Sequence, residues 1–476
     1  MNVPITRRDF RHTKIVCTLG PASKDTECIQ AMALAGMNVA RLNMSHGTHE
    51  SHLDLIEKIK GLNHKLNHPI AIMVDLQGPE IRTGEVPDNL HLQVGEQLWL
   101  TVSPMEDPEL KSVLVNYHDL ATDLSIGDRV TVDNGLINLE VLETRDRQLR
   151  CRVLHGGLLG SRRHVNLPGI RVNLPSITDK DRKDIAFAVE HKVEFIALSF
   201  VRGAEDVLEA RQLIGTGPEQ ALIWAKIENQ EGVSNFDAIL EAADGIMVAR
   251  GDLGVEVDIR ELPVIQRRVV RACALAGKPV IVATHLLESM INNPLPTRAE
   301  VTDVANAVYE QADALMLSGE TGAGKHPVRC VQVLEDIARR IEKEPSLAFH
   351  LNRQPQGSRE ELARSACRLA DSLGAYAIVV ITHRGRLAQL VASFRPTRAI
   401  IYAFTDLREV QRKLWMLRSV VPMETELSRD PETTVRDALA RLRQRNRLLA
   451  GDPVVVITDV VAGSERITSI QVRIFT

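Results

Sequence analysis

Two short apolar segments each end in charged residues of the kinds that bind metal ions and anions. The chain reads LIWAKIEN and, further on, GIMVARGDLGVE, so Lys226 and Glu228 follow the first apolar run and Arg250 and Asp252 follow the second. Such runs belong in a protein interior, where a bare charge is costly unless it is paired or bound to a metal. We interpret Glu228 and Asp252 as ligands of a divalent metal ion, and Lys226 as the group that faces an anionic substrate. A purely structural cluster of ion pairs is the alternative.

The elements that must position these residues are strand-like segments, each rich in Val, Ile, Leu, Met and Ala and followed by a stretch able to form a helix. Eight segments have this form: residues 12–21, 38–47, 70–80, 194–202, 223–229, 245–252, 279–289 and 314–321. Continuous apolar runs mark parallel strands covered on both faces, and eight of them predict a closed (β/α)8 barrel, an α/β fold. An open, doubly wound sheet with the same repeat is the alternative.

Polar residues gather where these predicted strands end, which is where a barrel of this kind carries its active site. They are Arg41, Asn43, Ser45, His46, Asp75, Glu80, Lys226, Glu228, Asp252, Thr284, Ser318 and Glu320. Few of them are needed for the stability of the strands, so the pattern indicates a site assembled from several strand ends.

Length and composition indicate a large enzyme of several domains. A chain of 476 residues is too long for one compact core, so we expect two or three domains. Lys plus Arg number 58 against 62 for Asp plus Glu, and this balance argues against nucleic acid or anionic membranes as main partners. Six cysteines without CxxC spacing are typical of free thiols in a reducing cytoplasm, and no apolar stretch is long enough to cross a membrane.

A different pattern fills residues 83–175, between the third and fourth predicted strands. HLQVGEQLWLTV, DRVTVDNGLINLEVL and QLRCRVL alternate apolar and polar residues, and Asn134-Gly135 is a strong tight-turn signal. We predict a small β-domain inserted at the third loop, where it lies over the mouth of the barrel and could close as a lid. Arg162 and Arg163 at its exit could then reach substrate phosphates; a solvated pair of charges is the alternative.

After a polar stretch near residues 344–360, predicted strands and helices alternate again and describe a separate α/β domain. Its first strand leads into ITHRGRLAQL, in which Thr382, Arg384, Gly385 and Arg386 precede a predicted helix. Such a turn offers backbone N–H groups and positive charge to a phosphate. An ordinary helix start with exposed arginines is the alternative.

Together these segments resemble the signature segments of pyruvate kinase. They are VARLNMSHG, VDLQGPEIRTG, VNLPG, IWAKIEN, GIMVARGDLGVE, VATHLLESM, NNPLPTRAEVTDVANAV and ALMLSGET, in that family's order and spacing. The resemblance covers about residues 11–345, and the C-terminal part has the family's outline. It implies a catalytic (β/α)8 TIM barrel at residues 1–83 and 171–345, an inserted β-barrel lid domain at 84–170, and a C-terminal α/β domain at 346–476 for regulation and oligomerisation.

The resemblance also implies a reaction. Members of the family transfer phosphate from phosphoenolpyruvate to ADP, giving pyruvate and ATP in glycolysis, as cytoplasmic homotetramers that use Mg²⁺ (or Mn²⁺) and often K⁺. By matching motif, Lys226 would lie beside the transferring phosphoryl group, while Glu228 and Asp252 would bind Mg²⁺. Arg41 and Arg82 would lie near the phosphate. Phosphoryl transfer needs charge neutralisation and alignment more than covalent help, which agrees with a lysine between carboxylates.

Further roles follow from the same motifs. Thr284 in VATHLLESM would lie on the face where the enolate is protonated, through a water molecule. The substrate carboxylate would be held at the turn formed by Ala249, Arg250, Gly251 and Asp252. The nucleotide would lie near His46, Asn43, Arg82 and Arg163.

The resemblance implies a monovalent cation as well. Asn43, Ser45, Asp75 and the carbonyl group of Leu76 would hold K⁺. In this family a Glu in GPEIR goes with K⁺ dependence, and a Lys in its place with independence, because an ammonium group can stand in for the ion. Glu80 occupies that position, so we expect K⁺ dependence.

Some segments depart from the family's pattern. Leu76 and Gln77 stand where many members have Thr and Lys, which preserves a carbonyl ligand but not a lysine contact. Near the C-terminus, THRGRLA and VVAGSERITS replace a Ser/Thr-rich loop and a glycine-rich segment of effector-binding members, which weakens the expectation of fructose 1,6-bisphosphate activation. A different phosphosugar or nucleotide, or no effector, fits the sequence; we place the effector contact at Thr382, Arg384, Gly385 and Arg386.

Two other function classes remain open. A Mg²⁺-dependent lyase acting on pyruvate or phosphoenolpyruvate could use similar Lys, Glu and Asp residues, but it would not explain the inserted lid together with the C-terminal domain. A catalytically silent, metabolite-sensing homologue would have no reason to retain Lys226, Glu228, Asp252, Arg41 and Thr284 together.

Overall fold

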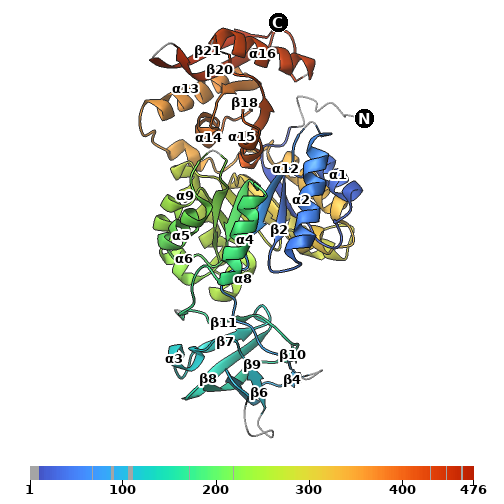
Figure 1. Cartoon of the computed structure of the whole chain (residues 1–476), viewed down its shortest axis with the longest axis vertical. Coiled ribbons are helices and arrows are strands. Elements are labelled where there is room, and N and C mark those ends of the chain that lie inside the picture. The colour runs from blue at the N-terminus through green and yellow to red at the C-terminus, as the bar shows by residue number, and fades with distance from the viewer. Residues whose placement is uncertain are drawn as a thin grey trace.

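The computed structural model describes residues 10–66, 68–86, 90–104, 111–170, 172–217, 219–428, 430–445, 447–462 and 465–475, with the side chains of residues 459–467 excepted. Three parts follow one another along the long axis: the lid at one end, the barrel in the middle and the C-terminal domain at the other end (Figure 1).

The central part is a closed barrel of parallel strands in the order β1-β16-β15-β14-β13-β12-β3-β2. Its strands are β1 (Lys14–Thr18), β2 (Val39–Asn43), β3 (Ala71–Asp75), β12 (Phe195–Leu198), β13 (Leu222–Ile227), β14 (Gly245–Ala249), β15 (Val280–Ala283) and β16 (Ala314–Leu317). Each lies within one of the eight segments expected from the sequence, apart from Leu222 at the start of β13. Because β1 pairs with both β2 and β16, the sheet closes and the open, doubly wound alternative is wrong.

Helices surround the barrel, and the short helix α8 (Arg250–Glu256) lies at its strand ends, next to the lid (Figure 1). They are α1 (Thr26–Ala35), α2 (His49–Asn63), α4 (Asp179–Glu190), α5 (Ala204–Ile214), α6 (Gln230–Ser234), α7 (Phe236–Ala242), α8 (Arg250–Glu256), α9 (Leu262–Ala276), η1 (Glu288–Ile291), α10 (Arg298–Tyr309), α11 (Gly319–Gly322) and α12 (Pro327–Ile341). Thr48, Thr178 and Thr297 precede α2, α4 and α10, and each hydroxyl accepts a hydrogen bond from a backbone N–H of the first turn. These caps fix where the helices begin.

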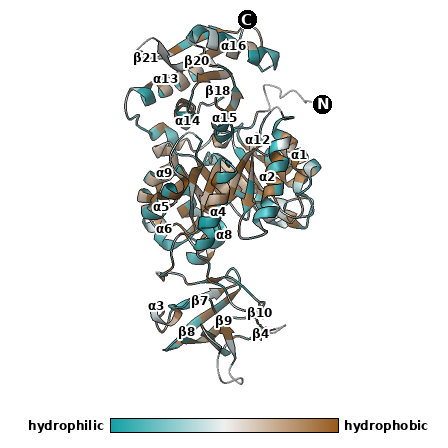
Figure 2. Cartoon of the chain, viewed as in Figure 1, coloured by the Kyte–Doolittle hydropathy of each residue, from teal (hydrophilic) through white to brown (hydrophobic). Residues whose placement is uncertain are grey.

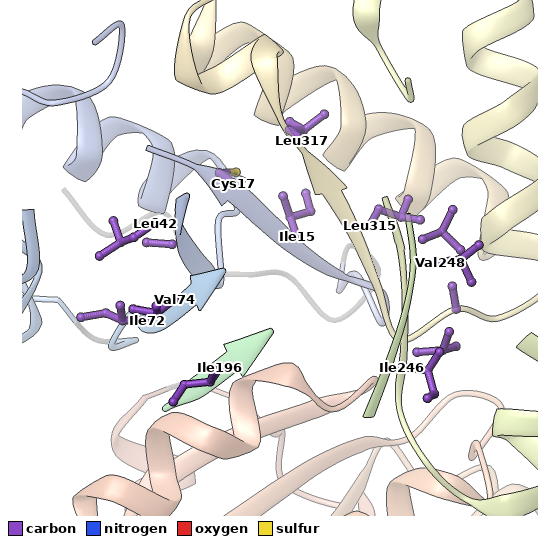
Figure 3. Packing of buried hydrophobic residues seen from close by; sticks show 14 of the residues in the cluster. Ile15, Cys17, Leu42, Ile72, Val74, Ile196, Ile246, Val248, Leu315 and Leu317 are labelled. Atoms are coloured by element: carbon purple, nitrogen blue, oxygen red, sulfur yellow. The ribbon is translucent and has the colours of Figure 1, made fainter. Parts of the chain in front are cut away.

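Alternate strand residues build two separate cores. Along β3, Ile72 and Val74 belong to the cluster between strands and helices, whereas Ala71 and Met73 belong to the cluster inside the barrel. Figure 3 shows the outer set on several strands, including Ile72, Val74 and Ile196. This period of two explains the continuous apolar runs in the sequence, because both faces of each strand are buried.

The lid is built from strands β4 (Leu90–Leu92), β5 (Gln97–Thr101), β6 (Ser112–Leu114), β7 (Arg129–Val132), β8 (Ile137–Arg145), β9 (Gln148–His155), β10 (Gly157–Leu159) and β11 (Val165–Asn166), with the short helix α3 (Leu120–Asp123). They form a six-stranded sheet, β11-β7-β8-β9-β5-β6, and a pair, β4 with β10. Asn134 and Gly135 lie between the antiparallel strands β7 and β8 with φ of 54° and 84°, which confirms the expected tight turn.

The C-terminal domain has a five-stranded sheet in the order β19-β18-β17-β20-β21. Its elements are η2 (Phe349–Asn352), α13 (Ser358–Leu373), β17 (Ala377–Ile381), α14 (Arg386–Ser393), β18 (Ile400–Thr405), α15 (Arg408–Lys413), η3 (Leu414–Met416), β19 (Val420–Glu424), α16 (Pro431–Gln444), β20 (Pro453–Ala462) and β21 (Glu465–Ile474). Residues from α13, α14 and α15 pack with one face of the sheet and residues from α16 with the other. Apolar colour is concentrated on the strands, and polar colour on the helices that cover them (Figure 2).

The C-terminal domain closes the end of the barrel where the strands begin. Met416 joins the cluster inside the barrel and is 1% exposed. The guanidinium group of Arg395 forms two hydrogen bonds of 2.8 and 2.7 Å with Asp313, which immediately precedes β16. The opposite ends of the strands therefore face the lid, and the two barrel ends have different neighbours.

In the described part of the chain, no helix combines the length and the apolar character needed to cross a membrane. All six cysteines are free thiols, and five of them are buried. This agrees with the free thiols expected from their spacing.

Candidate active site

A cavity of about 320 Å³ lies between the strand ends of the barrel and the lid. The barrel contributes side chains from the ends of β2, β3, β12, β13 and β14, and the lid contributes the segments around residues 133 and 163. The lining residues are Arg41, Asn43, Ser45, His46, Leu76, Gln77, Glu80, Arg82, Asp133, Asn134, Ser161, Arg162, Arg163, His164, Ser199, Phe200, Lys226, Glu228 and Asp252. Tertiary structure thus assembles into one cavity most of the polar residues that the sequence placed at strand ends.

Lys226 is held at the cavity by acceptors on two sides. Its Nζ lies 3.1 Å from Oδ1 of Asp75 and 3.0 Å from Oε1 of Glu228, and it donates a 2.7 Å hydrogen bond to the hydroxyl of Ser199. Burial alone would lower the pKa of this ammonium group, but Asp75 and Glu228 together raise that pKa above its ordinary value. Lys226 therefore stays positively charged at neutral pH and can face an anion.

Arg41 is oriented by the same aspartate. Its Nε donates to Oδ2 of Asp75 at 2.6 Å, and its Nη1 donates to the hydroxyl of Thr18 at 2.9 Å. Although burial raises the pKa of Asp75, Arg41 and Lys226 together lower it below its ordinary value. One buried carboxylate thus fixes two cations side by side, an arrangement that suits a phosphate.

Glu228 and Asp252 supply two carboxylates on neighbouring strands, β13 and β14. Glu228 accepts a 2.7 Å hydrogen bond from the backbone N–H of Phe200, and burial together with the charge of Asp252 raises its pKa to about 7, against the opposing effect of Lys226. A carboxyl group with a pKa of about 7 is only partly protonated at neutral pH, and a divalent cation would displace that proton.

These carboxylates fit a magnesium ion that completes its shell elsewhere. Among the described residues, no group of three or more His, Cys, Asp or Glu side chains is arranged to hold a metal ion. Mg²⁺ characteristically uses one or two carboxylates and takes its remaining oxygen ligands from substrate phosphates and water. The pair Glu228 and Asp252 therefore suits Mg²⁺ better than a metal that needs a closed protein shell.

The residues assigned to K⁺ lie together on adjacent strand ends. Asn43 is paired with Asp75 in the register of β2 and β3, and the amide oxygen of Asn43 accepts a 3.2 Å hydrogen bond from the backbone N–H of Ser45. The carbonyl oxygen of Leu76 accepts a 2.7 Å hydrogen bond from Ser199. All four groups expected to bind K⁺ would do so through oxygen atoms, which hard cations prefer as ligands.

The turn after β14 is tied to Thr284. The hydroxyl of Thr284 accepts a 2.7 Å hydrogen bond from the backbone N–H of Gly251 and donates at 2.6 Å to the carbonyl of Ala283. Thr284 has a φ of 67°, which is strained for a β-branched residue and typical of functional sites. Thr284, Ala249, Arg250 and Gly251 lie beside the cavity, not on its described wall.

Arg250 itself points away from the cavity. Its guanidinium group bonds with Asp303 at 2.7 Å and with the carbonyl of Thr284 at 2.6 Å, and the residue is 7% exposed. Its side chain therefore fixes the turn after β14, which leaves the backbone as the part of Arg250 available for substrate.

The lid side of the cavity is basic. Arg82 bonds with Oε2 of Glu80 at 2.6 Å and with the carbonyl of Arg162 at 2.9 Å. Arg163 lies 3.4 Å from Asp133, with half of its side chain exposed. Arg162 and Arg163 both line the cavity. Each already faces a carboxylate, Glu85 for Arg162 and Asp133 for Arg163.

Five cavity residues were not singled out from the sequence: Asp133, Ser161, His164, Ser199 and Phe200. Ser199 joins Lys226 to the Leu76 carbonyl, and its place at the end of β12 was the available signal. His164 from the lid lies 3.6 Å from Asp252 and packs near Phe200, with ring centroids 5.9 Å apart. Gln77 donates a 3.0 Å hydrogen bond to Glu80. Nothing in the local sequence of the lid indicated that His164 would reach across to the barrel.

Ser318 and Glu320 lie outside this cavity. Glu320 is 2% exposed and accepts hydrogen bonds from the backbone N–H groups of Leu287 and Ser318. At the end of β16, Glu320 therefore has a structural role, because it holds the backbone of two neighbouring segments.

The turn before α14 lies in the C-terminal domain, far along the chain from the cavity. The hydroxyl of Thr382 accepts a 3.1 Å hydrogen bond from the backbone N–H of Gly385, and Gly385 has a φ of 79°. Arg384 and Arg386 are exposed. The geometry agrees equally with a phosphate contact and with an ordinary helix start.

Comparison with known proteins gives a consistent result over the whole chain. A family model described as "Pyruvate kinase, barrel domain" matches residues 10–331, and one described as "Pyruvate kinase, alpha/beta domain" matches residues 360–472. Plastidial pyruvate kinase 3 of Arabidopsis thaliana is 43% identical over 452 residues, which cover 94% of this chain and 78% of the relative.

A bacterial relative and a solved structure belong to the same family. Pyruvate kinase of Geobacillus stearothermophilus is 42% identical over 470 residues, covering 97% of this chain and 80% of the relative. The crystal structure of a pyruvate kinase from Cryptosporidium parvum superposes with a TM-score of 0.92 at 36% identity, over 99% of this chain and 97% of that one.

Proposed function

The chain belongs to the pyruvate kinase family, and from that premise we propose that it transfers the phosphoryl group of phosphoenolpyruvate to ADP, giving pyruvate and ATP. The observation that carries the proposal is the group formed by Lys226, Arg41 and Asp75 beside two carboxylates at one cavity. Two fixed cations match the charge of a transferring phosphoryl group, and the carboxylates of Glu228 and Asp252 match a metal ion.

Lys226 carries the largest proposed catalytic effect. Its ammonium group is fixed by Asp75, Glu228 and Ser199, so little reorganisation is needed when charge develops on the phosphoryl oxygens. Arg41, fixed by Asp75 and Thr18, holds the phosphate from a neighbouring strand end. Since both cations are oriented before substrate arrives, they align the reacting groups as well as neutralise them.

Glu228 and Asp252 are the proposed Mg²⁺ ligands, and Asn43, Ser45, Asp75 and the Leu76 carbonyl are the proposed K⁺ ligands. Bound cations at these places would neutralise phosphate charge and orient the two substrates. Glu80 bonds with Arg82 and Gln77 and occupies the position at which a lysine ammonium group could replace the ion. Because this chain has a glutamate there, we propose that it requires K⁺.

The remaining roles concern pyruvate. The turn at Ala249, Arg250 and Gly251, at the start of α8, is proposed to hold the carboxylate through backbone N–H groups, because helix N-termini attract anions. In this structure the N–H of Gly251 donates to the hydroxyl of Thr284. Thr284, which contacts Gly251 beside the cavity, is proposed to orient a water molecule that protonates the enolate. For the nucleotide we propose His46, Asn43, Arg82 and Arg163, which all line the cavity.

The lid is proposed to exclude water during transfer. It already contacts the barrel, since Asn166 donates a 2.9 Å hydrogen bond to Glu256 and His164 lies beside Asp252. A homotetramer and an effector at the turn formed by Thr382, Arg384, Gly385 and Arg386 stay predictions. Light scattering of the purified chain tests the first.

The experiment that tests the function is pyruvate release from phosphoenolpyruvate and ADP with Mg²⁺, coupled to lactate dehydrogenase, with K⁺ or with tetraalkylammonium ions. We expect rapid turnover that depends on K⁺. Full activity without K⁺ would contradict the role given to Glu80. No turnover by folded protein in either buffer would favour the metabolite-sensing alternative.

A further inference from the structure

The first turn of α4 contacts both loops that carry the proposed K⁺ ligands. Lys180, in this turn, reaches the loop after β2, and Asp181 reaches the loop after β3. Neither residue lines the cavity at the lid. The turn therefore contacts the two loops from outside the cavity, and the proposed function gives it no role.

Lys180 holds the loop after β2 by its main chain. Its Nζ donates a 2.7 Å hydrogen bond to the carbonyl oxygen of Met44. Met44 lies between Asn43 and Ser45, the two proposed ligands from this loop, and both of these line the cavity. The Met44 side chain instead packs in the cluster between strands and helices and is 3% exposed. Lys180 and this cluster thus hold Met44 from one side, which leaves its two neighbours facing the cavity.

The ammonium group of Lys180 is itself fixed by a buried carboxylate. Nζ donates a second hydrogen bond, also of 2.7 Å, to Oδ2 of Asp184, one turn further along α4. The side chain of Asp184 is 2% exposed, and its Oδ1 lies 2.6 Å from Nε2 of His49 in α2. Because a buried carboxylate is costly without its partners, Asp184 keeps the Lys180 head group in place although the lysine stem is exposed.

Asp181 ties the same turn to the second loop. Its Oδ1 accepts a 3.1 Å hydrogen bond from the backbone N–H of Gly78, two residues after Leu76, whose carbonyl is a proposed K⁺ ligand. Its Oδ2 accepts hydrogen bonds of 2.9 and 2.6 Å from the backbone N–H and the hydroxyl of Thr178, which caps α4. The start of α4 is therefore fixed against the loop after β3, and from there Lys180 reaches the loop after β2.

The segment that joins the lid to α4 is also fixed to the barrel. The guanidinium group of Arg202, just after β12, donates hydrogen bonds of 2.7 and 2.6 Å to the carbonyls of Val172 and Leu174. It donates another, of 2.6 Å, to the hydroxyl of Ser176. The start of α4 thus belongs to the barrel, although α4 follows the lid in the chain.

We propose that Lys180 is a positioning residue for the monovalent cation, because it fixes the Met44 carbonyl and with it the side chains of Asn43 and Ser45. The inference rests on the proposed function, of which the cation site is a part. Groups that orient metal ligands from outside typically change metal affinity about 10- to 100-fold when they are removed.

The role assigned to Lys180 affects cation affinity and not the rate at saturation. Without Lys180, the loop after β2 adopts the binding geometry for only part of the time. The apparent Kd of the cation then rises by the inverse of that fraction. An excess of the cation restores the ordered loop, so the catalytic residues are left as they were.

The test measures cation affinity in two ways on the full-length protein. The first is the K⁺ concentration for half-maximal pyruvate release, at constant ionic strength with tetraalkylammonium nitrate as the balancing salt. The second is direct binding of Tl⁺, whose charge and size resemble those of K⁺, followed by thallium nuclear magnetic resonance. The second readout does not depend on turnover.

Four variants are compared with the unmodified protein, and thermal unfolding shows which of them fold. K180M removes the ammonium group, and K180Q replaces it with a shorter neutral amide, so the result does not depend on one variant. K180R keeps a cation that can reach the Met44 carbonyl. The matched control is K183M, which removes an exposed lysine from the same helix.

We expect K180M and K180Q to raise both the half-maximal K⁺ concentration and the Kd of Tl⁺ about 10- to 100-fold. At saturating K⁺ their kcat should lie within about twofold of the unmodified value. K180R should restore most of the affinity, and K183M should leave it unchanged.

Three results would overturn the inference alone, while the unmodified protein still responds to K⁺. They are an unchanged Kd of Tl⁺ in the Lys180 variants, a loss of rate that excess K⁺ does not restore, and failure of both K180M and K180Q to fold. Each would assign Lys180 to the fold only. If the unmodified protein neither binds Tl⁺ nor needs K⁺, the cation site of the proposed function fails, and this inference fails with it.

Discussion

The two ends of the barrel each hold a buried lysine, and the two lysines are in opposite electrostatic situations. Lys226, at the lid end, lies between two carboxylates, and its pKa is raised. Lys14, at the other end, has a pKa well below its ordinary value, because burial and then the nearby charge of Arg11 disfavour its ammonium form. Both are almost fully buried, so burial alone does not distinguish the lysine proposed for catalysis from the other one.

The surroundings explain the difference. Lys14 donates a 2.6 Å hydrogen bond to the carbonyl of Val420 in the C-terminal domain, and its Nζ lies 5.1 Å from the ring centroid of Trp415. Lys14 is therefore enclosed where the barrel meets the C-terminal domain. Lys226 instead opens onto a cavity and faces more carboxylate than it can neutralise. A buried charge indicates chemistry when it borders a cavity and its partners leave charge uncompensated.

The largest expected effect is at Lys226. We predict that K226M lowers kcat by about 10³- to 10⁵-fold while phosphoenolpyruvate binding changes little, because its charge matters most in the transition state. Steady-state kinetics combined with calorimetric substrate binding would measure both quantities. An equal loss of binding and rate would contradict this role and remove the contrast with Lys14.

Glu228 sharpens the contrast through the metal ion. E228Q should raise the Mg²⁺ concentration for half-maximal activity at least about tenfold, since an acceptor-only anionic ligand becomes a neutral amide. Electron paramagnetic resonance measures Mn²⁺ binding directly, so this readout does not depend on turnover. D258N is the matched control, because Asp258 is exposed and bonds with Arg260. Unchanged Mn²⁺ affinity in E228Q would exclude Glu228 as a ligand.

His12, at the barrel end that the C-terminal domain closes, makes the stability of the protein depend on pH. Burial lowers its pKa to about 4; Glu342 opposes this, and Arg418 and Lys14 add to it. Between about pH 6.5 and 4, His12 becomes protonated in the unfolded chain but stays neutral in the native state. The free energy of unfolding therefore decreases as pH falls, by at most about 3 kcal/mol. Thermal unfolding should therefore depend less on pH in H12N than in the unmodified protein. Parallel pH profiles would contradict the shift.

The smallest effect is expected at Lys14. In K14M the desolvated charge disappears, which offsets the loss of the hydrogen bond to Val420, so the unfolding free energy should change by about 1 kcal/mol or less. The turnover number should stay within about twofold. A large loss of activity would break the comparison, because it would give the closed end a catalytic role.

Much of the fold could be predicted from the sequence because its signals are local. The eight apolar runs fall on the barrel strands, and Asn134-Gly135 marks the lid turn, since period and turn chemistry act within a few residues. Lys226, Glu228 and Asp252 were found in the same way, as charges that interrupt buried runs.

Other features arise only when distant segments meet. Arg250 looks like a site residue in the sequence, yet its side chain bonds with Asp303 away from the cavity. His164 reaches Asp252 only because the lid folds back over the barrel. The sequence by itself determined the strands, their ends and the residue types at those ends, because these depend on local periodicity. Tertiary structure alone decided which lysine faces a cavity and which is enclosed, because a charge's state depends on neighbours hundreds of residues away, as Val420 is from Lys14.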